Sequence, residues 1–178
     1  MTVFPFYGIK LPESLKKEVV FRLLFLYREV VLNKNAVDGE SEAVIRSVCE
    51  ALGLTFVEAA MRKSGKTMDF SVVIHKKDGI STDDCARLHH ALFLKLQTLF
   101  QKEIGLEISS PGLDRTLKSE EEFRIFVGSP LRWLEKGAAD YRSGIIQNAD
   151  ERVVVVRTET GEEETVCVDN ILKAKLNG

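Results

Sequence analysis

The sequence predicts an α+β protein in which a two-layer αββαβ domain is followed by a small β-barrel domain. Helical and strand-like hydrophobic patterns alternate between residues 41 and 110, whereas strand-like patterns dominate after Pro130. Between the two regions lies Ser110-Pro111-Gly112, a turn-forming triplet at the end of an apolar stretch. With 178 residues, 44% of them hydrophobic and 29% charged, the chain is long enough for two small globular domains.

Residues 1–38 are predicted to form an N-terminal extension before the two domains, which we place at residues 39–117 and 118–178. Between Glu13 and Leu32 the apolar residues follow a helical period, and a loop pattern rich in Asn, Asp and Gly comes next. Three interpretations of the extension stay open. It is a further helix packed on the folded body, an amphipathic arm that binds a partner, or sequence translated from upstream of the natural start.

Composition favours a cytoplasmic protein. The first residues lack the basic region, apolar run and small-residue cleavage site of a secretory signal. The most apolar stretch, residues 19–32, contains charged residues and is shorter than the roughly 20 residues of a membrane span. The three cysteines lie far apart and are an odd number, which favours reduced thiols over a disulfide framework.

The first domain begins with a predicted helix and a predicted hairpin. Residues 41–52 follow a helical pattern that ends at Gly53, a residue type that favours the end of a helix. Strand-like alternation marks residues 54–61 and 68–76, which the hairpin-length loop 62–66 (RKSGK) joins. The inward-facing residues of the helix are expected to be Ala43, Val44 or Ile45, Val48, Cys49 and Leu52.

A long helix is predicted for residues 81–103, followed by a strand at residues 106–110. Ser81 or Thr82 is suited to cap its first turn, where the two aspartates that follow favour the positive end of the helix dipole. The resulting αββαβ order predicts a sheet with helices on one side. The apolar face of the long helix is expected to contain Leu88, Leu92, Leu96 and either Leu99 or Phe100.

The second domain is predicted to start with a short helix and to continue as strands. Residues 118–128 carry Ser119 as an N-cap and Gly128 as a stop signal. Five short strand patterns follow at close spacing, with NADE and TGEE as tight connections, and this spacing predicts a small barrel. The predicted strands are residues 129–135, 140–149, 151–159, 163–169 and 172–176.

The stretch LEISSPGLDR between the two domains could be an active site or a corner. A nucleophilic serine needs a base and oxyanion donors, and neither a GxSxG elbow nor a histidine close in sequence accompanies it. The sequence therefore favours a corner, with Pro111 at the first turn position and Gly112 in the left-handed conformation of a type II turn. We expect Leu113 to reach the core, and Asp114 and Arg115 to pair or to contact a partner.

A metal site on the long helix is the second chemical interpretation. Cys85 and His89 lie about one helical turn apart, close to Asp84 and His90. A closed zinc site needs four ligands, and the sequence has neither CxxC nor HxxxH spacing. We expect no metal, with Cys85 packed inward as a small apolar residue. A metal-dependent hydrolase that uses Cys85, His89 and Asp84 stays open as an alternative.

RNA binding is the third interpretation. The net charge of −2 argues against a protein that holds nucleic acid mainly through phosphate contacts, and a basic partner or an RNA–protein surface fits it better. The αββαβ order is that of KH-like domains, but the GxxG clamp of that class is missing. Arg62, Lys63 and Lys66 form a small basic loop that is either a phosphate contact or a solvated hairpin tip. A general RNA-binding regulator therefore stays open.

The stretch LEISSPGLDR closely resembles the central signature of the bacterial ribosome maturation factor RimP family. The segments ALGLTFVEAAM, GISTDDC and RTLKSEEEFRIFVGSPLRW occur in the order and spacing of that family, so the resemblance covers residues 41–176. The chain departs from it at residues 1–38, at Thr116, where proline is frequent, and at the strand end IHKK, where an acidic residue is more usual. The residues that match the signature are Ser109, Ser110, Pro111, Gly112, Leu113, Asp114 and Arg115, and those that match the helix-start motif are Asp83, Asp84 and Cys85.

The resemblance implies a KH-like αββαβ domain joined to an SH3- or Sm-like barrel. It also implies a protein without enzymatic activity or cofactor, which binds protein and rRNA surfaces of the immature small (30S) ribosomal subunit and assists its late assembly. We expect this protein to act in the cytoplasm as a monomer. The signature residues, with Asp83 and Asp84, are then candidates for contact with the ribosome, and the joint at Pro111 and Gly112 is expected to hold the two domains at a defined angle.

Overall fold

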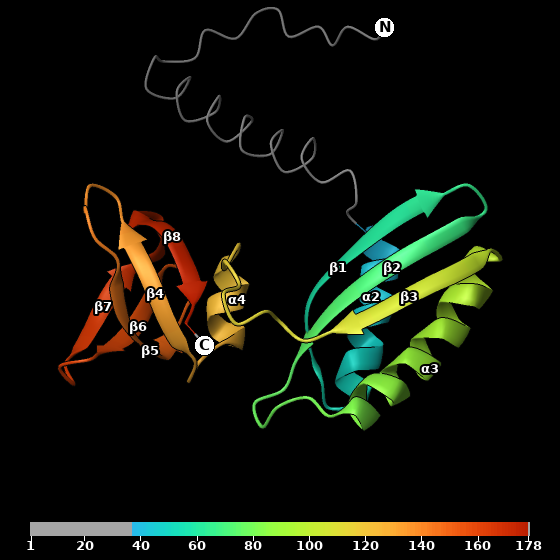
Figure 1. The fold of residues 1–178 in the computed structure, drawn as a ribbon, viewed down its shortest axis with the longest axis horizontal. Helices are drawn as coiled ribbons and strands as arrows, with labels where there is room; N and C mark the ends of the chain where they lie inside the picture. The colour runs from blue at the N-terminus through green and yellow to red at the C-terminus, as the bar shows by residue number, and fades with distance from the viewer. Residues whose placement is uncertain (1–36, 178) are drawn as a thin grey trace, which may run out of the picture. The chain divides into compact units, whose positions relative to one another are not determined.

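The computed structural model describes residues 37–177, and it confirms the predicted α+β class (Figure 1). The helix predicted between Glu13 and Leu32 lies outside the described residues. None of the helices in the described part of the chain is both long and apolar enough to cross a membrane. The elements are α2 (Gly39–Ala51), β1 (Thr55–Ser64), β2 (Thr67–His75), α3 (Thr82–Phe100), β3 (Glu103–Ser109), α4 (Glu120–Ile125), β4 (Pro130–Glu135), β5 (Arg142–Ala149), β6 (Val153–Thr158), β7 (Glu163–Cys167), a short 3-10 helix (Val168–Asn170) and β8 (Ile171–Leu176).

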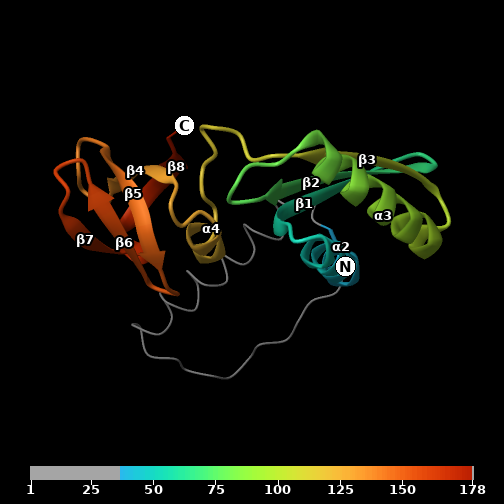
Figure 2. The same ribbon diagram turned by 90° about the horizontal axis from the view of Figure 1, so that it is seen from below.

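The first sheet contains three strands in the order β1-β2-β3. β1 and β2 are antiparallel and joined by a tight hairpin with Ser64 opposite Thr67, and its Gly65 has a φ of 60° that suits glycine. β3 runs parallel to β2, which requires the crossover that α3 supplies. α2 and α3 cover one face of this sheet (Figures 1 and 2), so the predicted order of elements, with helices on one side, is confirmed.

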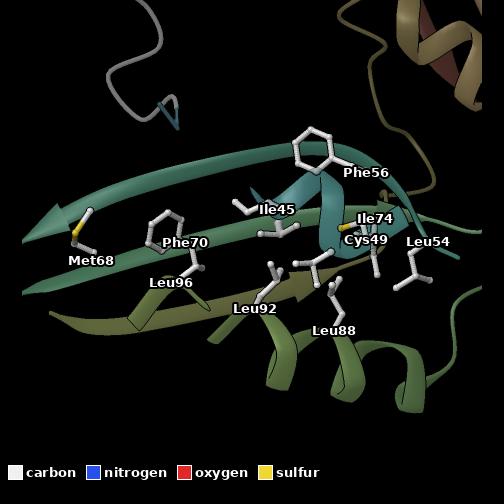
Figure 3. Packing of buried hydrophobic residues seen from close by; sticks show 12 residues of the cluster. Ile45, Cys49, Leu54, Phe56, Met68, Phe70, Ile74, Leu88, Leu92 and Leu96 are labelled. Carbon is white, nitrogen blue, oxygen red and sulfur yellow. The ribbon is translucent and has the colours of Figure 1, made fainter. Parts of the chain in front are cut away.

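The core of this region lies between the sheet and the two helices (Figure 3). Every second residue of β2 from Met68 to Ile74 is buried, and Leu88, Leu92 and Leu96 of α3 are fully buried. These are the two spacings by which a strand and a helix each present one face to a core. The hydrophobic pattern of the sequence therefore predicts this core correctly in its central part.

The predicted helices differ from the structure in their ends and in one inward-facing residue. α3 ends at Phe100 and not at residue 103, β3 begins at Glu103 and not at residue 106, and α4 spans only Glu120–Ile125 of the predicted 118–128. α2 begins two residues earlier than predicted, because the Asp38 side chain accepts a hydrogen bond of 3.0 Å from the Ser41 N–H and caps the helix. Ala43, predicted to face inward, is exposed, since it lies about 200° around the helix from the fully buried Ile45. In α3 the structure selects Phe100 over Leu99 for contact with the core.

The second sheet contains five antiparallel strands in the order β7-β6-β5-β4-β8. All five strands predicted in this region are present, whereas the 3-10 helix before β8 was not predicted. Ser119 caps α4 as predicted, and Gly128 follows the end of that helix with a φ of 91°. The second core contains Trp133 and Leu131 of β4 together with buried residues of α4, β5, β6, β7 and β8.

Candidate functional site

The signature segment, Ser109–Arg115, runs from the end of β3 into a turn. The Arg115 N–H donates a hydrogen bond of 3.0 Å to the Gly112 carbonyl, so the turn extends from Gly112 to Arg115. The φ of Gly112 lies outside the left-handed region. The predicted type II turn with a left-handed Gly112 is therefore wrong, because the chain reverses two residues further on, where Gly112 takes the first position and needs no such φ.

Leu113 and Asp114 occupy the two central positions of this turn. Leu113 is 73% exposed, so the prediction that it reaches the core is wrong. The physical reason is its place at the tip of the turn, together with Leu117, which fills the second core instead. Asp114 is exposed as well. The signature segment thus presents an apolar side chain and a carboxylate next to each other at the surface.

Arg115 is the buried charge of the signature segment, and it binds two glutamates. Its Nε and Nη2 donate hydrogen bonds of 3.1 and 2.9 Å to the two carboxylate oxygens of Glu122, in α4. Its Nη1 donates a third hydrogen bond, of 3.1 Å, to Glu58 in β1. The side chains of Arg115 and Glu122 are only 9% and 5% exposed. Within residues 37–177 Arg115 thus pairs with these glutamates and not with its neighbour Asp114.

The charges around Arg115 compensate one another. Burial opposes the charge on Arg115, but hydrogen bonds to Glu122 and Glu58 outweigh it and raise the pKa of the guanidinium above its ordinary value. Lys118 Nζ donates a hydrogen bond of 2.7 Å to Glu58. The hydrogen bond from Arg115, more than that from Lys118, lowers the pKa of the Glu58 carboxyl although burial acts in the opposite direction. We call Glu58, Arg115, Lys118 and Glu122 the junction cluster.

Glu58 reaches Arg115 because β1 contains a β-bulge. The pairing of β1 with β2 shifts between Phe56 and Glu58, so Val57 is an extra residue on β1. Phe56 and, beyond the bulge, Ala59 pack in the first core, whereas Val57 packs against the second core. The bulge therefore places two consecutive side chains, one apolar and one acidic, on the side of β1 that faces Arg115.

Two further contacts connect the same parts of the chain. Arg46 of α2 donates a hydrogen bond of 2.9 Å to Glu121 of α4, and the two side chains are 35% and 50% exposed. The rings of His75, at the end of β2, and Phe126 meet edge to face with their centroids 5.0 Å apart. Burial lowers the pKa of His75 below its ordinary value, which favours the neutral ring in this contact.

The backbone that follows the turn is attached to β8. The Leu176 N–H donates a hydrogen bond of 2.9 Å to the Arg115 carbonyl, and the Leu117 N–H donates one of 2.9 Å to the Ala174 carbonyl. Thr116 forms an isolated antiparallel bridge with Lys175 between them. The segment Arg115–Leu117, which we call the linker, thus pairs with the free edge of β8. This pairing fixes the end of the signature segment.

An apolar groove lies beside the signature turn. Among the described residues that line it, the charged ones are Lys76 and Lys77, and neither Asp nor Glu is present. The groove therefore combines an apolar surface with a positive edge. Its apolar lining includes Ile80, Pro111, Leu113, Phe126, Pro130 and Leu176.

The two aspartates of the helix-start motif lie at the beginning of α3 in different environments. Asp84 is buried and closes a capping box, because its carboxylate accepts a hydrogen bond of 3.1 Å from the Ser81 N–H. Lys76 and Arg87 bind the same carboxylate at 3.0 and 2.7 Å. The Ser81 N–H and then Lys76 keep the pKa of Asp84 well below its ordinary value. Asp84 is therefore engaged within the fold, whereas Asp83 is exposed.

The predicted basic loop is the tip of the β1–β2 hairpin. Arg62 and Lys63 belong to the end of β1, and Lys66 lies in the connection. All three residues are exposed, and none has an ion-pair partner within residues 37–177. Their side chains are thus accessible to a phosphate group, and they lie on a different part of the fold from the signature turn.

The residues considered for metal binding do not converge. Cys85 is half-buried and packs against the first core, which confirms its interpretation as a small apolar residue, and His89 is exposed. Between residues 37 and 177 no group of three or more His, Cys, Asp or Glu side chains is placed to hold a metal ion. Cys49 is fully buried, and burial raises the pKa of its thiol to about 11.

Comparison with known proteins identifies the family. Residues 44–114 match the family model of the RimP N-terminal domain. The ribosome maturation factor RimP of Borrelia recurrentis (strain A1) is 30% identical over 140 residues, which cover 79% of this chain and 96% of the relative. The chain belongs to the RimP family. RimP of Borrelia hermsii (strain HS1 / DAH) is 30% identical over 141 residues and RimP of Borrelia turicatae (strain 91E135) 28% over 140 residues, each with the same coverage.

The RimP signature segment, located from sequence alone, contributes only part of the site. Glu122 was not singled out, although the pattern Ser119-x-x-Glu122 of a capping box marks it as a residue with a specific partner. Glu58 carries no such signal, because its position depends on a bulge that forms when β1 pairs with β2. The basic hairpin tip was located correctly, but its contact with phosphate stays a prediction.

Proposed function

We propose that this chain is a ribosome maturation factor that binds the precursor of the small (30S) ribosomal subunit in the cytoplasm and assists its late assembly without catalysing a reaction. The observation that carries the proposal is the match over 140 residues to proteins named ribosome maturation factor RimP. Among the described residues, no group of three or more His, Cys, Asp or Glu side chains is placed to hold a metal ion. Binding that favours one arrangement of the partner accounts for assistance without chemistry.

We further propose that the chain acts as a monomer with two domains, a KH-like domain at residues 39–117 and an SH3- or Sm-like barrel at residues 118–178. The two separate sheets, each with its own cluster of buried residues, support this division. The pairing of Arg115–Leu117 with β8 supports a change of domain close to this segment. Both domains then contribute surfaces to one binding site on the ribosome.

We assign the contact with the small-subunit precursor to the exposed half of the signature segment. Leu113 and Asp114 project from the turn, whereas Arg115 is enclosed by glutamates. A large apolar side chain that is exposed beside an apolar groove is typical of a binding surface. The partner surface is expected to be apolar at its centre, with a basic group for Asp114 and a negative group for Lys77 at the edge of the groove.

Co-sedimentation with separated precursor small subunits, mature small subunits and large subunits tests this proposal. Leu113→Ser is expected to weaken binding to the precursor about tenfold, which corresponds to ~1.4 kcal/mol, because it removes the apolar contact. Leu94→Ser, at a leucine of α3 that is 51% exposed, is the matched control and is expected to bind like the wild type. Equal binding to all particles, or none to the precursor, contradicts the proposal.

The general RNA-binding regulator is the second candidate, and the exposed hairpin tip with Arg62, Lys63 and Lys66 favours it. The same samples distinguish the two candidates when naked single-stranded RNA is added as a competitor. A regulator of this kind would bind that RNA with an affinity that falls steeply with salt, by a slope of about 0.7 per phosphate contact. A maturation factor that reads an assembled surface is expected to keep its preference for the particle.

A further inference from the structure

We infer that Glu58 and Arg115 form a latch that fixes the three-stranded sheet to the linker and α4, so that both are positioning residues and not contacts with the partner. This inference concerns the free protein and goes beyond the proposed function. It starts from the arrangement of the three hydrogen bonds of Arg115. Two of them go to Glu122, which lies seven residues away in α4, and one goes to Glu58, which lies 57 residues away in β1.

The two glutamates therefore have different tasks. Glu122 holds the guanidinium with two parallel hydrogen bonds, the geometry in which an arginine–carboxylate pair is strongest and most directional. This pair, together with the hydrogen bond between the Arg115 carbonyl and β8, makes Arg115 part of the C-terminal region. Of the three N–H groups that remain, one on Nη1 donates to one oxygen of the Glu58 carboxylate, and the other oxygen of Glu58 lies 3.0 Å from Nη2. Glu58 is thus the group that joins the first sheet to a prearranged donor.

The bulge in β1 gives the latch its second component. Val57, the extra residue of the bulge, packs against the second core next to Glu58. This apolar contact beside Glu58 adds to the hydrogen bond in joining β1 to the second core. Without the bulge, Val57 and Glu58 would point to opposite faces of the strand and could not contribute together.

The burial of Arg115, and not that of Glu58, which is 35% exposed, distinguishes the latch from the other ion pairs of the same junction. The side chains of Arg46 and Glu121 are 35% and 50% exposed, and Lys118 is 64% exposed. Salt screens exposed pairs of this kind, and they contribute little to stability. Arg115, at 9% exposure, is screened much less. The junction is therefore expected to persist at ionic strengths that remove the contribution of the exposed pairs.

The latch explains why a signature segment that points outward contains a buried arginine. Arg115 closes the turn that begins at Gly112, so fixing Arg115 also fixes the two residues at the tip, Leu113 and Asp114. Only the use of this tip as a contact with the ribosome rests on the proposed function. The latch itself is a property of the isolated chain and can be measured without any partner.

Residual dipolar couplings of the full chain test the inference, because they report whether two parts of a protein share one alignment tensor. In the wild type, amides of β1–β3 and of β4–β8 are expected to fit a single tensor at both low and 0.5 M salt. Glu58→Ala is expected to require two tensors, with the amide spectra of both sheets otherwise retained. Glu121→Ala removes the exposed pair of the same junction and is expected to keep a single tensor.

Two results would overturn the latch: two tensors in the wild type, or one tensor in Glu58→Ala. Should Glu58→Ala fail to fold, Glu58→Gln decides, because it keeps the shape of the side chain and removes its charge. Two tensors at 0.5 M salt in that variant support the latch, and one tensor at both salt concentrations overturns it. Co-sedimentation is measured separately, so a latched protein that does not bind the small-subunit precursor contradicts the proposed function and leaves the latch intact.

Discussion

α3 and α4 begin with the same arrangement of side chains and use it differently. Each has a serine N-cap, Ser81 or Ser119, whose hydroxyl accepts a hydrogen bond from the N–H of the third helical residue. Each third residue, Asp84 or Glu122, is a buried carboxylate. In α3 the carboxylate of Asp84 returns to the Ser81 N–H and closes the capping box. In α4 the carboxylate of Glu122 binds Arg115 of the signature segment with both oxygens.

The same local sequence pattern can therefore either stabilise a helix start by itself or connect a helix to another part of the fold. The start of α3 is satisfied from within, because its cap, Lys76 and Arg87 all lie within eight residues of Asp84 along the chain. The start of α4 depends on Arg115, which in turn depends on Glu58 from another sheet. A helix whose capping box is closed, such as α3, therefore needs no distant residue to stabilise its start. In α4 the third residue binds Arg115 and not the cap, so the start of this helix belongs to the junction cluster.

The largest loss of stability is expected when the arginine that binds the third residue of α4 is removed. Removal of the corresponding arginine at α3 should have a much smaller effect. Arg115→Met leaves the carboxylate of Glu122 buried without a partner, and it is expected to lower the free energy of unfolding by about 3–5 kcal/mol. Arg87→Met, the corresponding change at α3, is expected to cost only a small part of this, because Arg87 is 62% exposed and Asp84 keeps Ser81 and Lys76. Urea unfolding of both variants measures the difference.

Equal losses in the two arginine variants would remove the contrast between the helix starts. A second variant separates the missing partner from the missing packing. When Glu122→Leu is added to Arg115→Met, no carboxylate is left buried and unpaired, and much of the lost stability should return. A double variant as unstable as Arg115→Met alone would show that the cost does not come from Glu122.

Removal of a serine cap should give the next largest loss of stability. Here the larger loss is expected at α3 and the smaller one at α4. Ser81→Ala removes a hydroxyl that takes part in a closed capping box at the start of a 19-residue helix, and a loss of about 1–2 kcal/mol is expected. Ser119→Ala removes one hydrogen bond of 3.3 Å from a six-residue helix that Arg115 and the second core also hold, and a loss near 0.5 kcal/mol is expected. Thermal unfolding compares the two, and a larger loss in Ser119→Ala would reverse the interpretation.

The smallest expected effect is the loss of stability when acid protonates Glu58. The pKa of Glu58 in the folded protein is lowered below its ordinary value of 4.5, first by the hydrogen bond from Arg115. A lowered folded pKa means that the unfolded chain takes up the proton first, so the stabilisation is complete at neutral pH and is lost as the pH falls below about 4.5. The difference in unfolding free energy between wild type and Glu58→Gln is expected to be below about 1 kcal/mol at pH 7 and to shrink as the pH falls below about 4.5.

Asp84 sharpens the acid comparison, because its ordinary pKa is lower, at 3.8, and several neighbours lower it further. The stabilisation that Asp84 provides should therefore persist to more acidic pH than that of Glu58. Urea unfolding of Asp84→Asn and Glu58→Gln beside the wild type, in steps from pH 7 to pH 3, follows both. A difference that is already lost at pH 6 in either variant would contradict the assignment to these carboxylates.

The sequence predicts the elements of the fold well because their signals are local. The buried alternation from Met68 to Ile74 and the four-residue spacing of Leu88, Leu92 and Leu96 each describe one face of one element. Ser119 and Gly53 mark helix ends through contacts with their immediate neighbours. Such signals need no knowledge of the rest of the chain.

The candidate site could be predicted only in part because its geometry is set by distant residues. The sequence locates the signature segment, but an apolar residue such as Leu113 carries no indication of whether its own core or an external partner covers it. The acceptor of Arg115 could not be chosen from the many carboxylates of the chain. Glu58 takes this place because of the bulge at Val57, and a bulge appears only when two strands are paired.

The pairing of the linker with β8 has a consequence for the newly made chain. Thr116 is translated roughly sixty residues before Lys175, its partner in the isolated bridge, so during synthesis the first sheet can be complete while the linker still has no strand to pair with. The free edge of the linker is then exposed until β8 leaves the exit tunnel. The pairing that fixes the end of the signature segment therefore forms last, after the polypeptide has been almost fully translated.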